Sequence, residues 1–202
     1  MCIRDRDKAV EKFEKITDTD TLYGKAAMDY KTAFSIFSKG MLALEKNDIN
    51  AAKSKLDQLD ALFWRNSKLE NEKDQISPFR LKTLLVTSVE LEGNILVAEK
   101  DLTKGIQTLE KAVKMEKDLG YSEPPYYPRP TLLSLASAYL NKGDYKNAES
   151  SYEKILEKHP NSSMAYWGLM NLYKENEQKD KYKMIRKKFE NVTKYGDREV
   201  FK

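Results

Sequence analysis

The sequence has very little of the residue types on which most familiar catalytic and metal sites depend. Its 202 residues include one cysteine and one histidine, which excludes a disulfide framework, a zinc site of Cys and His ligands and a centre with several histidines. The eight glycines form no Gly-x-Gly sequence, so neither a dinucleotide-binding fingerprint nor a Walker loop is present. His159 lies in a Lys-His-Pro-Asn turn without a local partner for base catalysis. The composition therefore predicts no catalytic residue, no metal ligand and no cofactor.

Long apolar runs are also missing. The most apolar stretch, residues 81–98, is interrupted by Lys82, Glu90 and Glu92, whereas a bilayer span needs about 18 or more consecutive apolar residues. The chain is 40% hydrophobic and 34% charged, with a mean hydropathy of −0.72. This profile predicts a soluble, folded protein without a membrane span, and it leaves the cellular compartment unknown.

The first six residues, Met-Cys-Ile-Arg-Asp-Arg, resemble a translated sequencing-adapter leader of the kind that precedes open reading frames from assembled short reads. This resemblance predicts that residues 1–6 are not native and that Cys2 has no biological role. It also predicts that the natural protein begins further upstream.

Positive charge in excess of acid is confined to the end of the chain. Residues 174–202 hold ten Lys and Arg against six Asp and Glu. The positive and negative charges of the other 173 residues cancel. Acids at Glu175, Glu177, Asp180 and Glu190 are interleaved with the lysines, so we expect a solvated helix face. Binding of nucleic acid or an anionic surface through these cations is the alternative, and the interleaved acids disfavour a nucleic-acid partner.

Helical patterns run along almost the whole chain. Apolar residues recur at spacings of three and four, and no stretch alternates as a strand would. Turn residues cut this pattern into about eight or nine helices, and Ser77-Pro78 is typical of a helix cap followed by a first-turn proline. We therefore predict an all-α protein of antiparallel helix pairs.

Pairs of small residues recur twelve positions apart: Gly40 and Ala52, Gly93 and Gly105, Ala136 and Ala148. A small residue on each helix of a hairpin lets the two axes approach closely. An aspartate precedes the second member of each pair by four residues, at Asp48, Asp101 and Asp144. We expect it to cap the second helix of each hairpin.

The third of these units resembles a tetratricopeptide repeat, a 34-residue helical hairpin. The matching positions are Leu132, Leu135, Ala136, Tyr139, Gly143, Asp144, Tyr145, Ala148, Tyr152, Ile155 and Pro160. A following unit is similar at Tyr166, Leu169 and Tyr173 but has Met170 and Tyr182 where small residues belong, as a terminal unit would. The resemblance implies a right-handed α-solenoid and a C-terminal fragment of a bacterial repeat protein.

Four segments follow from this reading. Residues 1–6 are the leader, 7–120 form degenerate helical repeats, 121–130 form a connection rich in Pro and Tyr, and 131–202 form the repeat with its capping unit. Proline excludes helix at the preceding residue, so the connection should run as a stiff, extended strap. Its tyrosines either pack on helix ends or form a lip that contacts a ligand.

The resemblance also implies where a ligand would bind, because the first helices of stacked repeats line a concave groove. The corresponding positions are Leu133, Ser137, Leu140, Asn141, Trp167, Asn171, Lys174 and Glu175. Tyr166 and Trp167 are adjacent and diverge by about 100° on a helix, so we place Tyr166 in the core and Trp167 in the groove. Packing of Trp167 on a neighbouring repeat or on the strap is the alternative.

The function that these patterns favour is a scaffold without enzymatic activity that binds a peptide or protein partner. A carboxylate clamp for chaperone tails is disfavoured, because Leu133 and Ser137 stand where the first lysine and asparagine of that motif would be. The alternatives are a helical accessory region of a larger protein and the basic helix described above. Self-association through uncovered end helices is a further expectation.

Overall fold

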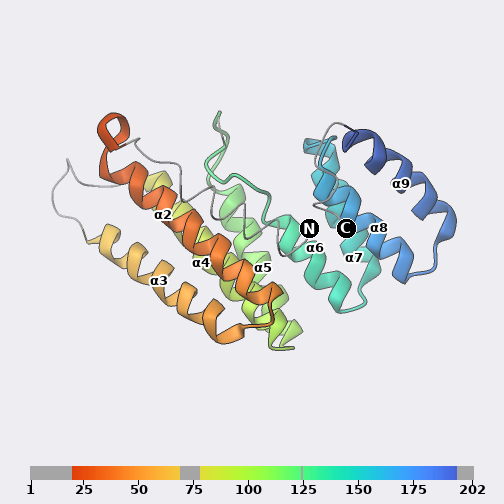
Figure 1. Ribbon diagram of the computed structural model, residues 1–202, viewed down its shortest axis with the longest axis horizontal. Coiled ribbons are helices and arrows are strands. Elements are labelled where there is room, and N and C mark those ends of the chain that lie inside the picture. Colours follow the sequence, from red (N-terminus) through yellow and green to blue (C-terminus); the bar gives the residue numbers. More distant parts are fainter. Residues whose placement is uncertain (1–19, 69–77, 124, 195–202) are drawn as a thin grey trace. The chain divides into compact units, whose positions relative to one another are not determined.

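The computed structural model describes residues 20–68, 78–123 and 125–194. The described residues form eight α-helices and no strand, which confirms the all-α fold class (Figure 1). The leader at residues 1–6 and the expected cap Ser77 lie outside the described residues. None of the described helices is long and apolar enough to cross a membrane.

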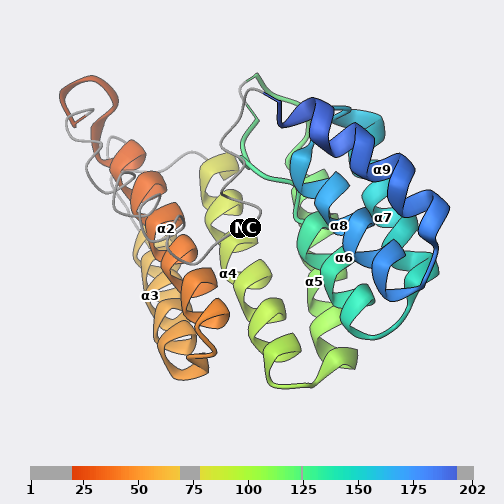
Figure 2. The same cartoon turned by 45° about the vertical axis from the view of Figure 1, so that its right-hand side comes forward.

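The chain divides after Pro128 into two compact units, which are described separately. The N-terminal unit contains α2 (Asp20–Glu45), α3 (Ile49–Ser67), α4 (Pro78–Ala98) and α5 (Leu102–Lys117). The C-terminal unit contains α6 (Leu132–Asn141), α7 (Tyr145–Lys158), α8 (Ser163–Glu175) and α9 (Lys179–Val192). In each unit consecutive helices pair as hairpins and the second hairpin packs on the first (Figure 2).

All four hairpins turn through the same backbone motif. The second residue after the end of the first helix has a positive φ, at Asn47 (59°), Lys100 (72°), Gly143 (77°) and Glu177 (54°). Its N–H and the next N–H bond back to carbonyls three and five residues earlier, as in Gly143 to Leu140 and Asp144 to Tyr139. This is the Schellman ending of a helix. It brings the second helix back against the first.

The residue that follows each positive-φ position is the N-cap of the second helix. The side chains of Asp48, Asp101 and Asp144 accept hydrogen bonds from the backbone N–H groups of Ala51, Lys104 and Asn147. These bonds confirm the predicted caps at three of the four hairpins. At the fourth, Gln178 stands at the cap position and makes no side-chain cap bond.

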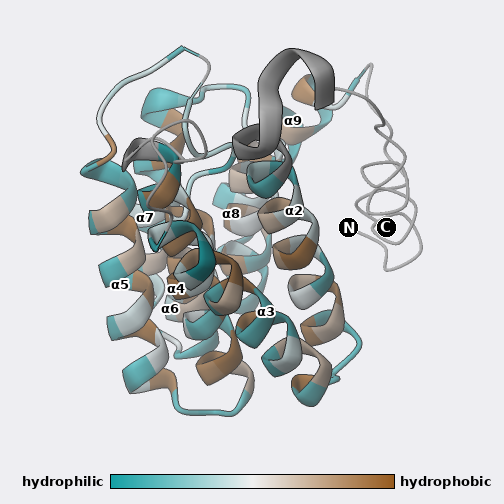
Figure 3. Cartoon of the chain, turned by 90° about the vertical axis from the view of Figure 1, so that its left-hand side faces the viewer, coloured by the Kyte–Doolittle hydropathy of each residue, from teal (hydrophilic) through white to brown (hydrophobic). Residues whose placement is uncertain are grey.

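Hydrophobic and hydrophilic residues alternate along the helices (Figure 3). The buried apolar side chains of paired helices pack in shared clusters. In the N-terminal unit the core joins α2, α3 and α4 through Phe37, Leu59 and Leu91. In the C-terminal unit it joins all four helices, with Ala136, Ala148, Leu169 and Ile185 among its buried members. Each unit therefore has a hydrophobic core of its own.

The segment after α5 is fastened to the N-terminal unit by two tyrosines. Tyr127 is 4% exposed, packs on Phe34 with 5.6 Å between ring centroids, and donates a hydrogen bond to the buried carboxylate of Glu90. The backbone carbonyl of Tyr126 accepts a hydrogen bond from the hydroxyl of Tyr30. Both side chains pack in a cluster with Phe34 of α2 and Val86 of α4, which lie in the middle of their helices rather than at the ends. Tyr121, in contrast, is 90% exposed.

Candidate functional site

The candidate site lies on the first helices of the two C-terminal hairpins, α6 and α8, which contact each other. Helix α7 returns from α6 to α8, and Ser162 caps α8 by accepting a hydrogen bond of 3.3 Å from the N–H of Ala165. His159 is the C-cap residue that follows α7 and is exposed, as predicted for a turn residue. The two first helices therefore present adjacent rows of side chains.

Tyr152 of α7 fills the space between these two helices. Its side chain is 3% exposed, and burial raises the pKa of its hydroxyl, so the group is neutral. The hydroxyl lies 3.2 Å from Oγ of Ser137 on α6. A Cβ atom added at Gly168 of α8 would lie 2.2 Å from Cζ of Tyr152. The ring therefore lies against the backbone of α8 and hydrogen bonds to α6.

Helix α6 carries four of the positions implied for ligand contact, and the structure distributes them differently. Leu133 is 8% exposed and belongs to the core, so little of its surface can reach a ligand. Ser137 is exposed, but its hydroxyl donates to the carbonyl of Leu133 at 3.0 Å. Leu140 is half-buried and Asn141 is exposed. The accessible part of this row is therefore Ser137 together with the last turn of the helix.

Helix α8 carries the remaining positions. Lys174 and Glu175 are exposed in its last turn, and Asn171 is half-buried one turn earlier. Trp167 is half-buried and packs on Phe189 of α9, with ring centroids 5.9 Å apart and planes at 44°. The indole is therefore supported from α9. It retains partial exposure.

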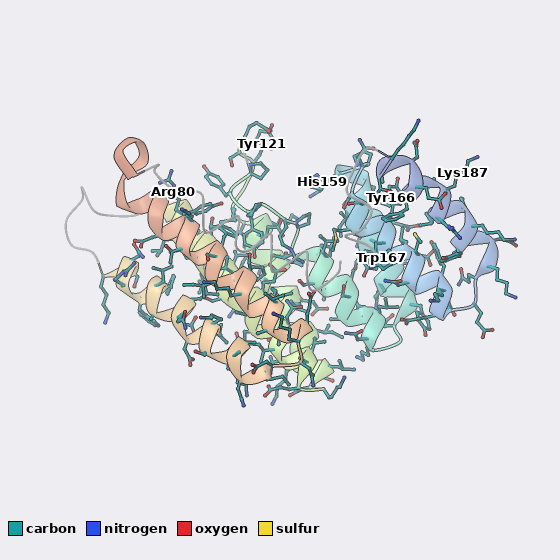
Figure 4. The ribbon with its side chains drawn as sticks, viewed as in Figure 1. Arg80, Tyr121, His159, Tyr166, Trp167 and Lys187 are labelled. Atoms are coloured by element: carbon teal, nitrogen blue, oxygen red, sulfur yellow. The ribbon has the colours of Figure 1, made fainter. Side chains whose placement is uncertain are left out.

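Tyr166 and Trp167 both border the core of the C-terminal unit (Figure 4). The hydroxyl of Tyr166 donates to the carbonyl of Pro160 at 3.0 Å, which ties the first turn of α8 to the turn that precedes it. Because both aromatic side chains are half-buried, the division between a core tyrosine and a groove tryptophan is less sharp than the sequence suggests.

A polar cluster joins α7, α8 and α9 through Glu149, Tyr173 and Lys181. One carboxylate oxygen of Glu149 accepts from the Tyr173 hydroxyl at 2.7 Å and from Nζ of Lys181 at 2.8 Å. Burial alone would raise the pKa of Glu149, but the two hydrogen bonds and the charge of Lys181 outweigh it and lower that pKa. Burial and the adjacent carboxylate raise the pKa of Tyr173. The cluster holds the last helix in place.

The small residues predicted at helix contacts lie as follows. Ala52, Ala136 and Ala148 are fully buried, the last two in one core cluster. A Cβ atom at Gly105 would lie 3.2 Å from the carbonyl oxygen of Gly93, so the two glycines mark a close approach of α4 and α5. At Gly40 the nearest atoms belong to Leu91 of α4, at 2.7 Å, rather than to Ala52. Gly40 therefore leaves room for α4, the first helix of the next hairpin.

Sequence reasoning missed Gly168, which provides the close approach in the terminal unit. The expected small positions there are occupied by Met170 and Tyr182, yet the contact is made two residues earlier on α8. A glycine inside a helical pattern is the available signal, because it commonly marks a tight packing contact. Within the described ranges, no three His, Cys, Asp or Glu side chains gather as metal ligands could.

Comparison with protein families identifies one repeat of known type. Residues 131–162 match the family model described as Tetratricopeptide repeat, and this range extends from the residue before α6 to the cap of α8. No curated protein matches the chain. The α6–α7 hairpin is therefore a repeat of the tetratricopeptide type, a unit typical of helical protein-interaction modules that act as scaffolds rather than enzymes.

Proposed function

We propose that the C-terminal unit binds a peptide segment of a protein partner along α6 and α8, without catalysing a reaction. The observation that supports this proposal most directly is the surface formed by the last turns of the two helices. Asn141, Lys174 and Glu175 are exposed there, beside the half-buried Leu140 and Asn171. These side chains supply two amides, both charges and an apolar contact.

This combination suits an extended peptide. An asparagine amide offers both a donor and an acceptor, and therefore can bond both groups of a peptide unit. Trp167 packs on Phe189 and offers a rigid aromatic edge to a ligand. Tryptophan is often found as an anchor residue in interfaces. Leu133 contributes through the core rather than by contact, because it is 8% exposed.

A binding experiment tests the proposal. Peptides would be selected from a random library for binding to the 202-residue chain. The selected peptides would then be labelled, and their affinity for the chain would be measured by fluorescence anisotropy. Asn171→Ala combined with Lys174→Ala should weaken binding by about tenfold or more, as expected for removal of two polar contacts.

The matched control changes Lys154 and Glu157 to Ala on α7, since both side chains are exposed and neither belongs to the proposed groove. This control should bind as the parent chain does. Equal affinity of the groove variant and the parent, with circular dichroism unchanged, would exclude the groove as the binding surface.

A further inference from the structure

The outward side of α9 is a basic surface with an exposed methionine. The helix packs on α8 through Ile185, which is buried, and through the half-buried Phe189. On its opposite side lie Lys183, Met184 and Lys187, which we call the α9 face; Met184 is 52% exposed. Figure 4 shows Lys187 pointing away from the unit. With six Lys and Arg against two acids, α9 carries a formal charge of +4.

The two lysines of the α9 face are not neutralised by the described residues of their own unit. Lys181 pairs with Glu149 at 2.8 Å and Arg186 with Glu190 at 2.9 Å, whereas Lys183 and Lys187 take part in no ion pair in the described part of the chain. Like charges four residues apart on a helix repel each other. An acidic surface that met both lysines would relieve this repulsion.

The outward side of α3 in the N-terminal unit has the complementary character. The helix packs inward through Ala52, Leu59 and Leu62. The opposite side carries Asp57, Asp60 and Trp64, which we call the α3 face. Their spacing of three and four residues aligns them in one stripe.

The α3 face combines unpaired acids with an exposed aromatic side chain. Trp64 is 60% exposed, and neither aspartate takes part in an ion pair within the ranges that the structure describes. Phe63 packs on the indole at 5.7 Å between centroids, and Nζ of Lys68 lies 5.9 Å from the same ring. A large indole left in water is a common anchor of protein interfaces.

We propose that the α3 face of one copy of this chain binds the α9 face of a second copy. Asp57 and Asp60 would pair with Lys183 and Lys187, whose spacing of one helical turn matches theirs. The thioether of Met184 would contact the indole of Trp64, a favourable sulfur–aromatic pair. Because the two faces differ, the contact is heterologous, and each copy keeps one face available for the next.

The size and charge of the contact determine its properties. One helix face on another buries less than the roughly 1,200 Å² of a stable interface, so the association is weak and reversible. Exposed ion pairs are screened as ionic strength rises, with a Debye length of about 10 Å at 0.1 M salt. Association should therefore grow with protein concentration and decline with added salt.

Sedimentation velocity on the full 202-residue chain tests the proposal between about 10 and 500 μM protein, a range suited to weak contacts. In about 20 mM salt the average mass should rise with concentration, and about 300 mM salt should suppress the rise. Lys183→Glu with Lys187→Glu, and separately Asp57→Lys with Asp60→Lys, should each give a monomer at every concentration. Lys154→Glu with Lys158→Glu on α7 is the matched control and should associate as the parent does.

Mixing provides the decisive measurement. Each double variant alone presents two faces of like charge, whereas an equimolar mixture pairs the acidic α9 face of one variant with the basic α3 face of the other. The mixture should therefore recover the association of the parent chain. A parent that stays monomeric at the highest concentration, or a mixture that stays monomeric, would overturn the proposal.

The same variants separate self-association from nucleic-acid binding. If the lysine double variant lost retention on duplex DNA while its sedimentation matched that of the parent, the α9 face would be a nucleic-acid surface and the proposal would be wrong. Asn171→Ala with Lys174→Ala, which tests the groove, should leave the sedimentation unchanged. Failure of one proposal is therefore distinguishable from failure of the other.

Discussion

Substitution of Gly168 by alanine tests whether Tyr152 sets the packing of α8 on its neighbours. In an open helix this change would stabilise the protein by about 1 kcal/mol, because alanine has the higher helix propensity. Here the added Cβ would lie 2.2 Å from Cζ, 2.3 Å from Cε1 and 2.7 Å from the hydroxyl oxygen of Tyr152. The ring is 3% exposed and cannot turn aside without leaving the core.

The size of the destabilisation follows from the displacement of Tyr152 that the added carbon requires. Forcing one extra carbon into a well-packed core costs about 1–3 kcal/mol, and displacement of the tyrosine would also break its contact with Ser137, which is worth about 1 kcal/mol. After the gain in helix propensity is subtracted, Gly168→Ala should lower the free energy of unfolding of the C-terminal unit by about 1–3 kcal/mol.

Urea unfolding followed by tryptophan fluorescence provides the assay. Trp64 lies in the N-terminal unit and Trp167 in the C-terminal unit, so a Trp64→Phe background makes the signal specific to the unit that contains Gly168. Low protein concentration keeps self-association out of the measurement.

A double-mutant cycle makes the test strict. In a Tyr152→Leu background the ring atoms that meet the new Cβ are gone, and Gly168→Ala should become neutral or stabilising by up to about 1 kcal/mol. The sign of the effect should therefore invert between the two backgrounds. A stabilising effect beside the intact tyrosine would refute the packing argument, as would equal effects in both backgrounds.

Three further predictions concern the turns, the glycine contact and the polar cluster. Lys100→Gly should stabilise the N-terminal unit and Gly143→Ala should destabilise the C-terminal unit, because both positions have positive φ. Urea unfolding should show a change of about 1 kcal/mol for each variant. An effect of the opposite sign at either position would contradict the turn assignment. Gly105→Ala should cost about 1–3 kcal/mol in the N-terminal unit, since its Cβ would lie 3.0 Å from the backbone nitrogen of Val97; a neutral result would mean that α4 and α5 separate easily. Burial opposes ionisation of Glu149, but its hydrogen bonds outweigh burial and lower its pKa. The contribution of Glu149 to the free energy of unfolding is therefore complete above its unfolded-state pKa of about 4.3. It is lost as the pH falls through the lower folded-state value. Glu149→Gln should therefore make unfolding of the C-terminal unit less sensitive to acid, by about 1 kcal/mol or less, and an unchanged acid dependence would show that the cluster does not stabilise the fold.

The helices, their caps and their pairing could be predicted because they depend on local chemistry. Asp48, Asp101 and Asp144 bond to N–H groups three residues ahead, so a short stretch of sequence contains the whole interaction. The positive φ at Gly143 belongs to the same local class. At Lys100 and Glu177 the same conformation is adopted by residues that give no such signal, because the return of the second helix imposes it.

The contacts that position the candidate site could not be predicted in the same way, because they join residues far apart in the sequence. Glu149 and Lys181 are separated by 32 residues, and neither is distinguishable in sequence from the many other charged residues on helix faces. The contact of Tyr152 with Gly168 crosses from one hairpin to the next. A repeat template places small residues by average spacing. In this protein the position of the Tyr152 ring determines that a glycine is needed at position 168.

The two sides of α9 explain why the two proposals can be tested independently. Its inner side carries Phe189, which supports the indole of Trp167, so a change there would disturb the groove on α8. Its outer side carries Lys183 and Lys187, which form no ion pair with any residue that the structure describes. Because residues on opposite sides of a helix do not touch each other, reversing the outer charges should leave the indole in place. A helix that only closed a hydrophobic core would need the inner side alone. Self-association accounts for the two lysines on the outer side, which form no ion pair within the described ranges.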